Sequence, residues 1–292
     1  QQTFFKLLYF QDILMTRSHL ISRFGRNQHA LRSATPLADD QIRAIAPSIF
    51  ADDKHASRSD RYTYIPTSDV LQGLRKEGFS PFMVCQTRTR DEAKRDHTKH
   101  MVRLRHVSQI EATEANEIVL LNSHDGSSSY QMIAGVFRFV CSNGMVCGDL
   151  QSDIRVRHSG NIVGNVIEGA FRVLGGFDLV DGQKEGMKAL TLNRGEQIAF
   201  ARASLALRYD TEIAPAPITE DQLLHVRRNV DGVNDLWTTL NRVQENVIRG
   251  GLSGRSANHK RITTRAVEGI DQGIKLNRAL WVLAEEMRKL KA

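Results

Sequence analysis

The densest cluster of positive charge in the sequence lies between Gln86 and His106, where seven cations face three acids. The cations are Arg88, Arg90, Lys94, Arg95, Lys99, Arg103 and Arg105. A guanidinium offers a planar fork of donors that matches phosphate oxygens, so closely spaced arginines are typical of phosphate binding. The segment therefore indicates a polyanionic partner.

Residues 100–109 alternate as a β-strand does, and this period decides where the cations would point. A period of two places Lys99, Arg103 and Arg105 on one face and apolar residues on the other. We therefore expect an exposed row of cations on one face of a sheet. The alternative is a solvated face with no ligand. The pattern recurs in a second predicted strand, at Arg155 and Arg157.

A second basic segment runs from Arg249 to Arg265 and contains no acid. Glycines let backbone amides approach an anion closely, and the start of a following helix, capped by Thr263 or Thr264, would favour a phosphate. We expect a flexible clamp that becomes ordered on an anion, the alternative being a plain connection between two helices. Its cations are Arg249, Arg255, Lys260, Arg261 and Arg265, and its glycines are Gly250, Gly251 and Gly254.

The segment from Phe137 to Gly144 combines aromatic residues with a turn signal. On a strand, Phe137 and Phe139 share one face with Cys141, and Arg138 points the other way. We expect the aromatic rings to pack in a core. Stacking of bases on exposed rings is the alternative. Asn143 and Gly144 accept a positive φ, so a tight turn is predicted there.

Signatures of catalysis are weak. The sequence lacks the glycine-rich loop with Lys and Ser or Thr that holds a triphosphate. A nuclease site could use His124 and Asp125 beside Glu117, or Asp149 near Asp153, but neither set has a recognisable metal-ligand spacing. Cys141 and Cys147 are interpreted as packed residues rather than nucleophiles. We predict no catalytic residue, no metal and no cofactor.

The composition is that of a globular protein with a basic surface. The 292 residues are 41% hydrophobic and 25% charged, with a formal net charge of +7 and an isoelectric point near 9.5. Such a field favours a polyanion, of which nucleic acid is the commonest. Three cysteines without a Cys-x-x-Cys pair indicate a reducing cytoplasm, and no apolar run is long enough to span a membrane.

The predicted architecture is α+β, with a mostly antiparallel sheet, packed helices and a helical C-terminal unit. Residues 1–60 are expected to form a loosely held arm, of which 1–14 are interpreted as translated upstream or added sequence. A sheet-and-helix core over 61–214 and a helical unit over 218–292 would meet at Pro215 and Pro217. Strands are expected at 61–65, 80–89, 100–109, 117–122, 130–141 and 153–158, and helices at 67–76, 161–174, 196–209, 233–249 and 264–291.

Several segments together resemble a known family. They are Phe137–Gly144, Asn234–Trp237, Gln244–Asn246 and Asn277–Trp281. They are similar to the phage and plasmid-like proteins of domain-of-unknown-function family nine-thirty-two, from about Arg61 to the C-terminus. The resemblance implies carriage on prophages and plasmids of bacteria. It implies no reaction.

These observations predict an ATP-independent DNA-binding protein of a mobile element. We expect binding or annealing of single-stranded DNA in recombination, with duplex DNA as a second possible ligand. By analogy of fold and setting, the sheet would be Rad52-like and the protein a homo-oligomer, as a ring or filament. The alternative is a protein-binding anti-defence or regulatory module that presents Trp237 and Trp281 to a partner. The residues predicted to contact nucleic acid are Arg88, Arg90, Lys99, Arg103, Arg105, Arg138, Arg155, Arg157, Arg249, Arg255, Lys260, Arg261 and Arg265.

Overall fold

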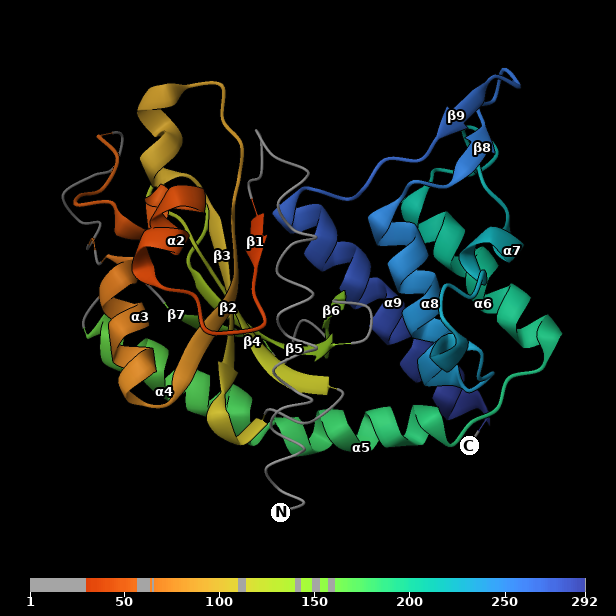
Figure 1. Cartoon of the computed structure of the whole chain (residues 1–292), viewed down its shortest axis with the longest axis horizontal. Helices are drawn as coiled ribbons and strands as arrows, with labels where there is room; N and C mark the ends of the chain where they lie inside the picture. Colours follow the sequence, from red (N-terminus) through yellow and green to blue (C-terminus); the bar gives the residue numbers. More distant parts are fainter. Residues whose placement is uncertain are drawn as a thin grey trace, which may run out of the picture.

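A curled antiparallel sheet forms one half of the molecule and a group of helices the other (Figure 1). The computed structural model describes residues 30–56, 64, 66–109, 114–139, 143–148, 153–156 and 161–291. Within these ranges the main sheet has the strand order β1-β2-β3-β4-β5-β6, and β7 also pairs with β5. Its strands are β1 (Ala30–Arg32), β2 (Phe79–Gln86), β3 (His100–His106), β4 (Glu114–Asn122), β5 (Tyr130–Arg138), β6 (Asn143–Val146) and β7 (Ile154–Val156). The predicted α+β class with an antiparallel sheet is confirmed.

One face of the sheet packs on the helices α2 (Asp39–Ile45), α3 (Thr67–Lys76) and α4 (Ile162–Gly175). In α3, Val70, Leu71 and Leu74 are buried, which is the spacing of a single apolar helix face. They meet strand residues such as Val84 and Leu104 in the main core. Complete burial of one such side chain contributes about 1.5–3 kcal/mol, so this layer accounts for a large part of the stability.

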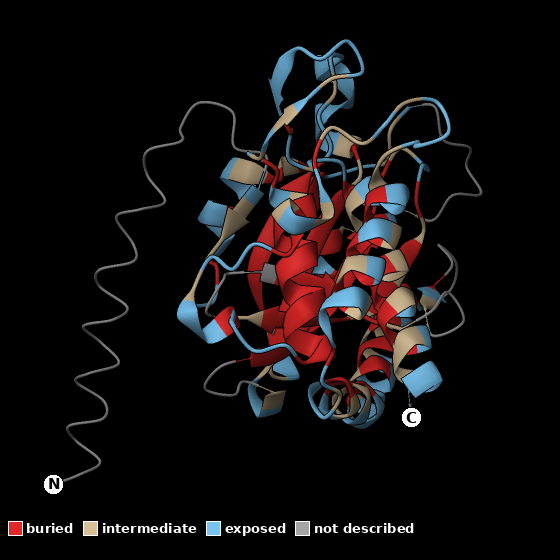
Figure 2. Ribbon diagram, turned by 90° about the vertical axis from the view of Figure 1, so that its right-hand side faces the viewer, coloured by how far each residue is buried: buried red, intermediate tan, exposed pale blue. Residues whose placement is uncertain are grey.

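The other helices surround α8 (Leu236–Arg249), whose residues 236–247 are all buried. Figure 2 shows this buried interior, with exposed elements around it. Asp235 caps the helix by accepting a hydrogen bond from the Thr238 amide at 2.7 Å, and the helix ends at Gly250, where φ is +65°. The helices around α8 are α5 (Phe177–Lys188), α6 (Arg194–Arg208), α7 (Glu220–Leu223) and α9 (Ile270–Lys291).

The second face of the sheet lies under the first turns of α9. Its apolar cluster includes Met101, Val119 and Ile133 from the strands and Ile270 from α9. Both faces of the central strands are thus covered, and all nine residues of β4 are buried. This explains why alternation along a strand does not report exposure here.

The segment expected to be a loose arm is built into the core where the structure describes it. Over residues 30–56 it forms β1, α2 and the short 3-10 helix η2 (Pro47–Phe50), and it buries Leu37, Ile42 and Ile49. The expectation is wrong for this part because these apolar side chains fill the space beside α3. The predicted strand at 61–65 lies outside the described residues except for Tyr64, and residues 1–14 lie wholly outside them.

A continuous cluster of buried side chains joins the sheet with the C-terminal helices. It includes Leu104 and Val136 from the strands, Phe200 from α6 and Leu240 and Leu280 from α8 and α9. The division at Pro215 and Pro217 stays a prediction. Helices predicted at 67–76, 161–174, 196–209, 233–249 and 264–291 correspond to α3, α4, α6, α8 and α9. The helices α2, α5 and α7, the strands β1 and β6, and the short strands at 253–255 and 261–263 were not predicted.

Candidate nucleic-acid interface

The predicted row of exposed arginines on β3 is buried, which is the main correction to the sequence analysis. Arg103 and Arg105 retain only 4% and 2% of their accessible surface. Both point to Glu117 on β4: Nη1 of Arg103 lies 2.8 Å from one carboxylate oxygen and Nε of Arg105 lies 2.9 Å from the other. The alternation was predicted correctly, but the face is covered and the neighbouring strand supplies the counter-charge. These two arginines cannot reach a phosphate in this structure.

Aromatic rings enclose the guanidinium of Arg105. Its Cζ lies 4.2 Å from the ring centroids of Phe82 and Phe137 and 5.1 Å from that of Phe139. Burial lowers the pKa of Arg105, and the charge of Glu117 opposes this shift. The rings therefore pack on a buried cation, which agrees with core packing and not with base stacking for Phe137.

Gly144 has a packing role that its sequence context did not reveal. It lies in β6, opposite Phe137, although a tight turn was predicted over residues 142–144. Ser142, like Cys141, lies outside the described part of the chain. A Cβ atom at Gly144 would come within 2.5 Å of Nη1 of Arg103. Only a residue without a side chain leaves room for this guanidinium.

Arg138 belongs to a second buried ionic network. It lies 3.1 Å from Asp231 and 3.7 Å from Glu114. Glu114 also forms an ion pair with Lys184 at 3.1 Å and accepts a hydrogen bond from the indole N–H of Trp237 at 3.0 Å. The network ties the paired ends of β4 and β5 to α5 and α8, so the side chain of Arg138 is held within the fold rather than exposed.

The loop between β2 and β3 keeps most of its cations on the surface, but Lys99, at its end, retains only 15% of its side-chain surface. Arg88 and Arg90 are exposed. Arg88 lies 3.8 Å from Glu268, and Lys99 donates to Asp271 at 2.9 Å. These two pairs connect the first basic segment with the chain that leaves the second one and enters α9.

The second basic segment forms a β-hairpin rather than a flexible loop. Strands β8 (Ser253–Arg255) and β9 (Arg261–Thr263) pair, and they project from one end of the molecule (Figure 1). Arg255 stands directly opposite Arg261. Figure 2 shows the hairpin as almost wholly exposed. Its exposed cations are Arg255, Lys260, Arg261 and Arg265.

The hairpin is held at its base by the segment that follows Pro215. The Arg255 amide donates to the Pro217 carbonyl at 2.9 Å, and Gln222 donates to the Ser253 carbonyl at 2.7 Å. Gly254 lies so close to the Pro217 carbonyl that a Cβ atom would overlap it. Arg249, the last residue of α8, pairs with Glu245 of the same helix at 3.2 Å. The backbone contacts fix the hairpin, and the cationic side chains at its tip stay exposed.

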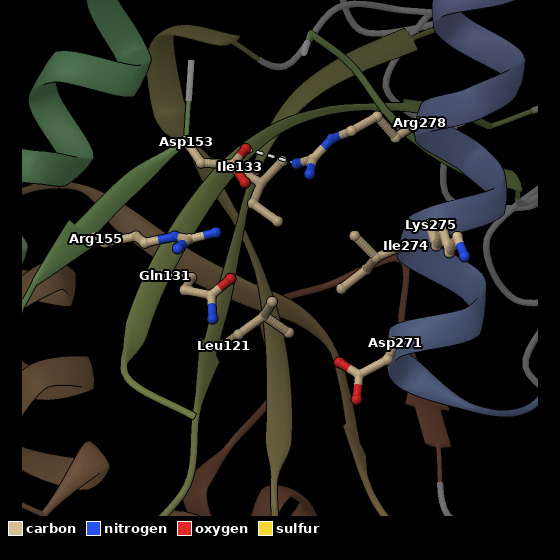
Figure 3. Close-up of a pocket in the computed structure, with 9 residues that line it drawn as sticks. All are labelled: Leu121, Gln131, Ile133, Asp153, Arg155, Asp271, Ile274, Lys275 and Arg278. Carbon is tan, nitrogen blue, oxygen red and sulfur yellow. Dashed lines mark hydrogen bonds and ion pairs between the residues drawn. The ribbon is translucent and has the colours of Figure 1, made fainter. Parts of the chain in front are cut away.

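A cleft lies between the sheet and the start of α9 (Figure 3). Arg155 of β7 lines it, together with Lys275 and Arg278 of α9. Arg157 lies outside the described residues. Lys275 and Arg278 were not predicted, although their spacing gave a signal: positions 271, 274, 275 and 278 follow the i, i+3, i+4, i+7 pattern of one helix face.

Residues considered for catalysis are placed apart. Glu117 is bound to the two arginines, whereas His124 is buried near Thr67, whose hydroxyl lies 3.4 Å from its Nε2. Among the described residues, no three His, Cys, Asp or Glu side chains are grouped to hold a metal ion. Burial raises the pKa of Cys85 to about 12 and also raises that of Cys147. Neither thiol is placed to act as a nucleophile.

The two tryptophans expected to face a partner are core residues. Trp237 and Trp281 retain 2% and 1% of their surface and make an edge-to-face contact with centroids 6.3 Å apart. This removes the surface on which the protein-binding alternative depended. In the described part of the chain, every helix is too short or too polar to cross a bilayer.

An α+β protein with buried arginine clusters and a projecting basic hairpin is the class that this geometry defines. The family described as "Domain of unknown function (DUF932)" matches residues 54–281, and the chain belongs to it. It is similar to UPF0380 protein YafZ of Escherichia coli (strain K12), with 53% identity over 94% of this chain and 98% of that protein. UPF0380 protein YfjQ of the same strain is 52% identical over the same shares. No solved structure matches significantly.

Proposed function

We propose that the protein binds DNA without nucleotide hydrolysis and without sequence specificity, and that it binds or anneals single strands during recombination of a mobile element. The observation that carries the proposal is the facing pair of Arg255 and Arg261 on an exposed hairpin. Like charges directly opposite each other in a sheet are destabilising. A phosphate between the two guanidinium groups would turn this repulsion into attraction.

The cations around the hairpin extend this surface. Lys260 and Arg265 are exposed beside the pair, and no acid occurs from Arg249 to Ala266. The exposed loop with Arg88 and Arg90 joins the segment after the hairpin through Glu268. A backbone of phosphates could therefore pass from the hairpin to the loop and meet cations at both places.

The proposal differs in location from a Rad52-like binding face, which would use the sheet. Arg103 and Arg105 are withdrawn into ion pairs, so the contact elements left are the hairpin, the loop and the exposed Arg155 of β7. A two-stranded ribbon also fits the major groove of a duplex. A binding experiment in which single-stranded and duplex DNA compete for the protein decides which of the two it prefers. Assembly into a ring or filament and action in the bacterial cytoplasm belong to the same proposal. The free cysteines Cys85 and Cys147 support a reducing compartment.

The test is a titration of labelled single-stranded and duplex DNA by fluorescence anisotropy, beginning at about 50 mM salt, with light scattering for the size of the complex. The hairpin variant carries Arg255→Ala, Lys260→Ala and Arg261→Ala. We expect it to lose affinity for all sequences alike and to lower the slope of log K against log salt by about 0.7 for each lost contact on a single strand.

The matched control removes three other exposed cations, with Lys76→Ala, Arg172→Ala and Lys289→Ala, from α3, α4 and the end of α9. It changes the net charge by the same amount and should bind DNA nearly as the unchanged protein does. Equal losses in both variants would show a diffuse charge effect rather than a site. A protein that binds no DNA at this salt contradicts the proposal and leaves a protein-binding module that uses a surface other than Trp237 and Trp281.

A further inference from the structure

The cleft beside α9 is suited to a small flat group. Its volume is about 330 Å³. Ligand sites in proteins span about 300–1,000 Å³, so this cleft accepts one ring-sized unit rather than an extended molecule. Leu121, Ile133 and Ile274 form its apolar floor (Figure 3), and this floor belongs to the apolar cluster on the second face of the sheet.

Two ion pairs hold the walls of the cleft. Arg278 donates to Asp153 at 2.5 Å, and Lys99 donates to Asp271 at 2.9 Å. Asp153 and Arg278 are themselves largely buried. The acids that line the cleft are therefore already neutralised, and the walls do not depend on a ligand for their charge balance.

Two cations of the cleft have no such counter-charge. Arg155 and Lys275 are exposed, and neither makes an ion pair with any residue that the structure describes. Figure 3 shows the guanidinium of Arg155 directed into the cleft, beside the amide of Gln131. The cleft thus combines an apolar floor, one amide and two cations, Arg155 and Lys275, that no acid of the described residues pairs with.

From this combination we infer that the cleft is a subsite for one nucleotide unit of a bound single strand. The base lies against Ile274, above the buried side chains of Leu121 and Ile133, and the Gln131 amide meets a polar edge of the base. Arg155 and Lys275, from opposite walls, contact the phosphates on the two sides of that base. The amide can both donate and accept, so it tolerates any base. This inference rests on the proposed function, because only a single strand has an unpaired base that can enter the cleft.

The cleft and the hairpin can be observed separately in one experiment. The isoleucine methyl groups report on both places: Ile133 and Ile274 lie in the cleft, and Ile262 lies on β9 of the hairpin. Methyl NMR spectra of the full chain are recorded during titration with oligo-dT and with an abasic strand of equal length, which has the same phosphates but no bases. We expect oligo-dT to shift all three methyl signals, and the abasic strand to shift Ile262 alone.

The variant with Arg155→Ala and Lys275→Ala tests the phosphate contacts. It should lower the affinity for oligo-dT about tenfold or more and reduce the preference for oligo-dT over the abasic strand. The control is Lys289→Ala on the same helix. If oligo-dT shifts Ile262 but leaves Ile133 and Ile274 unchanged, the subsite is overturned and the proposed function stands. If none of the three signals moves, both fail.

Discussion

Arg105 of β3 and Glu117 of β4 form a buried ion pair, with Nε of the arginine 2.9 Å from a carboxylate oxygen. Arg103 shares the same carboxylate through its other oxygen. One acid thus balances two buried cations, while three phenylalanine rings enclose Arg105. Removing one partner of a buried pair leaves an uncompensated charge, which is more costly than replacing the whole group.

The first prediction concerns Glu117→Gln. The amide keeps the shape of the side chain but leaves Arg103 and Arg105 without a counter-charge. We expect the free energy of unfolding to fall by about 3–5 kcal/mol, measured by urea denaturation. The control, Glu286→Gln on the exposed face of α9, should change it by less than about 0.5 kcal/mol. Equal stability of the two variants would mean that the buried arginines find another anion.

The second prediction concerns Gly144→Ala. The added methyl group meets the guanidinium of Arg103, which its bond to Glu117 holds in place. We expect a loss of about 1–3 kcal/mol from overpacking, seen as a lower melting temperature. Gly182→Ala in α5 is the matched control, since nothing lies within 4 Å of its added carbon. There alanine should stabilise the helix by about 0.5–1 kcal/mol. A harmless Gly144→Ala would show that Arg103 can move aside.

The third prediction concerns pH. Burial lowers the pKa of His100 to about 4. Its Nδ1 lies 2.8 Å from Ser48 Oγ and its Nε2 lies 2.9 Å from Thr67 Oγ1. Above about pH 6.5 the ring is neutral in the folded and the unfolded chain, so stability does not depend on it.

Between about pH 6.5 and about 4 the His100 ring is protonated in the unfolded chain but stays neutral in the folded chain. Stability should therefore fall with decreasing pH across this window, by up to roughly 3 kcal/mol from this group. Urea denaturation at several pH values measures the fall, and His100→Gln should flatten it. The same slope in both proteins would exclude His100 as its source.

The fourth prediction concerns the thiols. Cys85 and Cys147 are buried, and burial raises the pKa of both. In a Cys141→Ser background we expect no rapid reaction with a thiol reagent until the protein unfolds, when both groups react. Rapid reaction of the folded protein would show that one of the two is open to solvent.

Alternation and helical spacing predicted most of the elements, because these patterns depend on local chain geometry. The sequence marks Arg103 and Arg105 as a pair on one strand face, and this is correct. Their burial depends on Glu117, on the phenylalanine rings around Arg105 and on β6 beside Arg103, which are close only after the chain has folded. The sequence of a strand is the same whether its charged side chain is solvated by water or paired with a carboxylate.

In the hairpin, the exposure of the cations was predicted correctly and the order of the backbone was not. Its glycines and its lack of acids were read as flexibility, yet Gly254 is required for close contact with Pro217. A flexible loop was expected there, but the segment forms two paired strands. Contacts between segments distant in sequence again made the difference.

The anchoring of the hairpin on Pro217 bears on how fast the protein would capture a ligand. A segment that must fold on its ligand loses conformational entropy at that moment and adds a slow step. The hydrogen bonds to Pro217 and from Gln222 already order this hairpin. Encounter with a polyanion should therefore be a single diffusive event, accelerated by the positive field, and its rate should fall as salt is added.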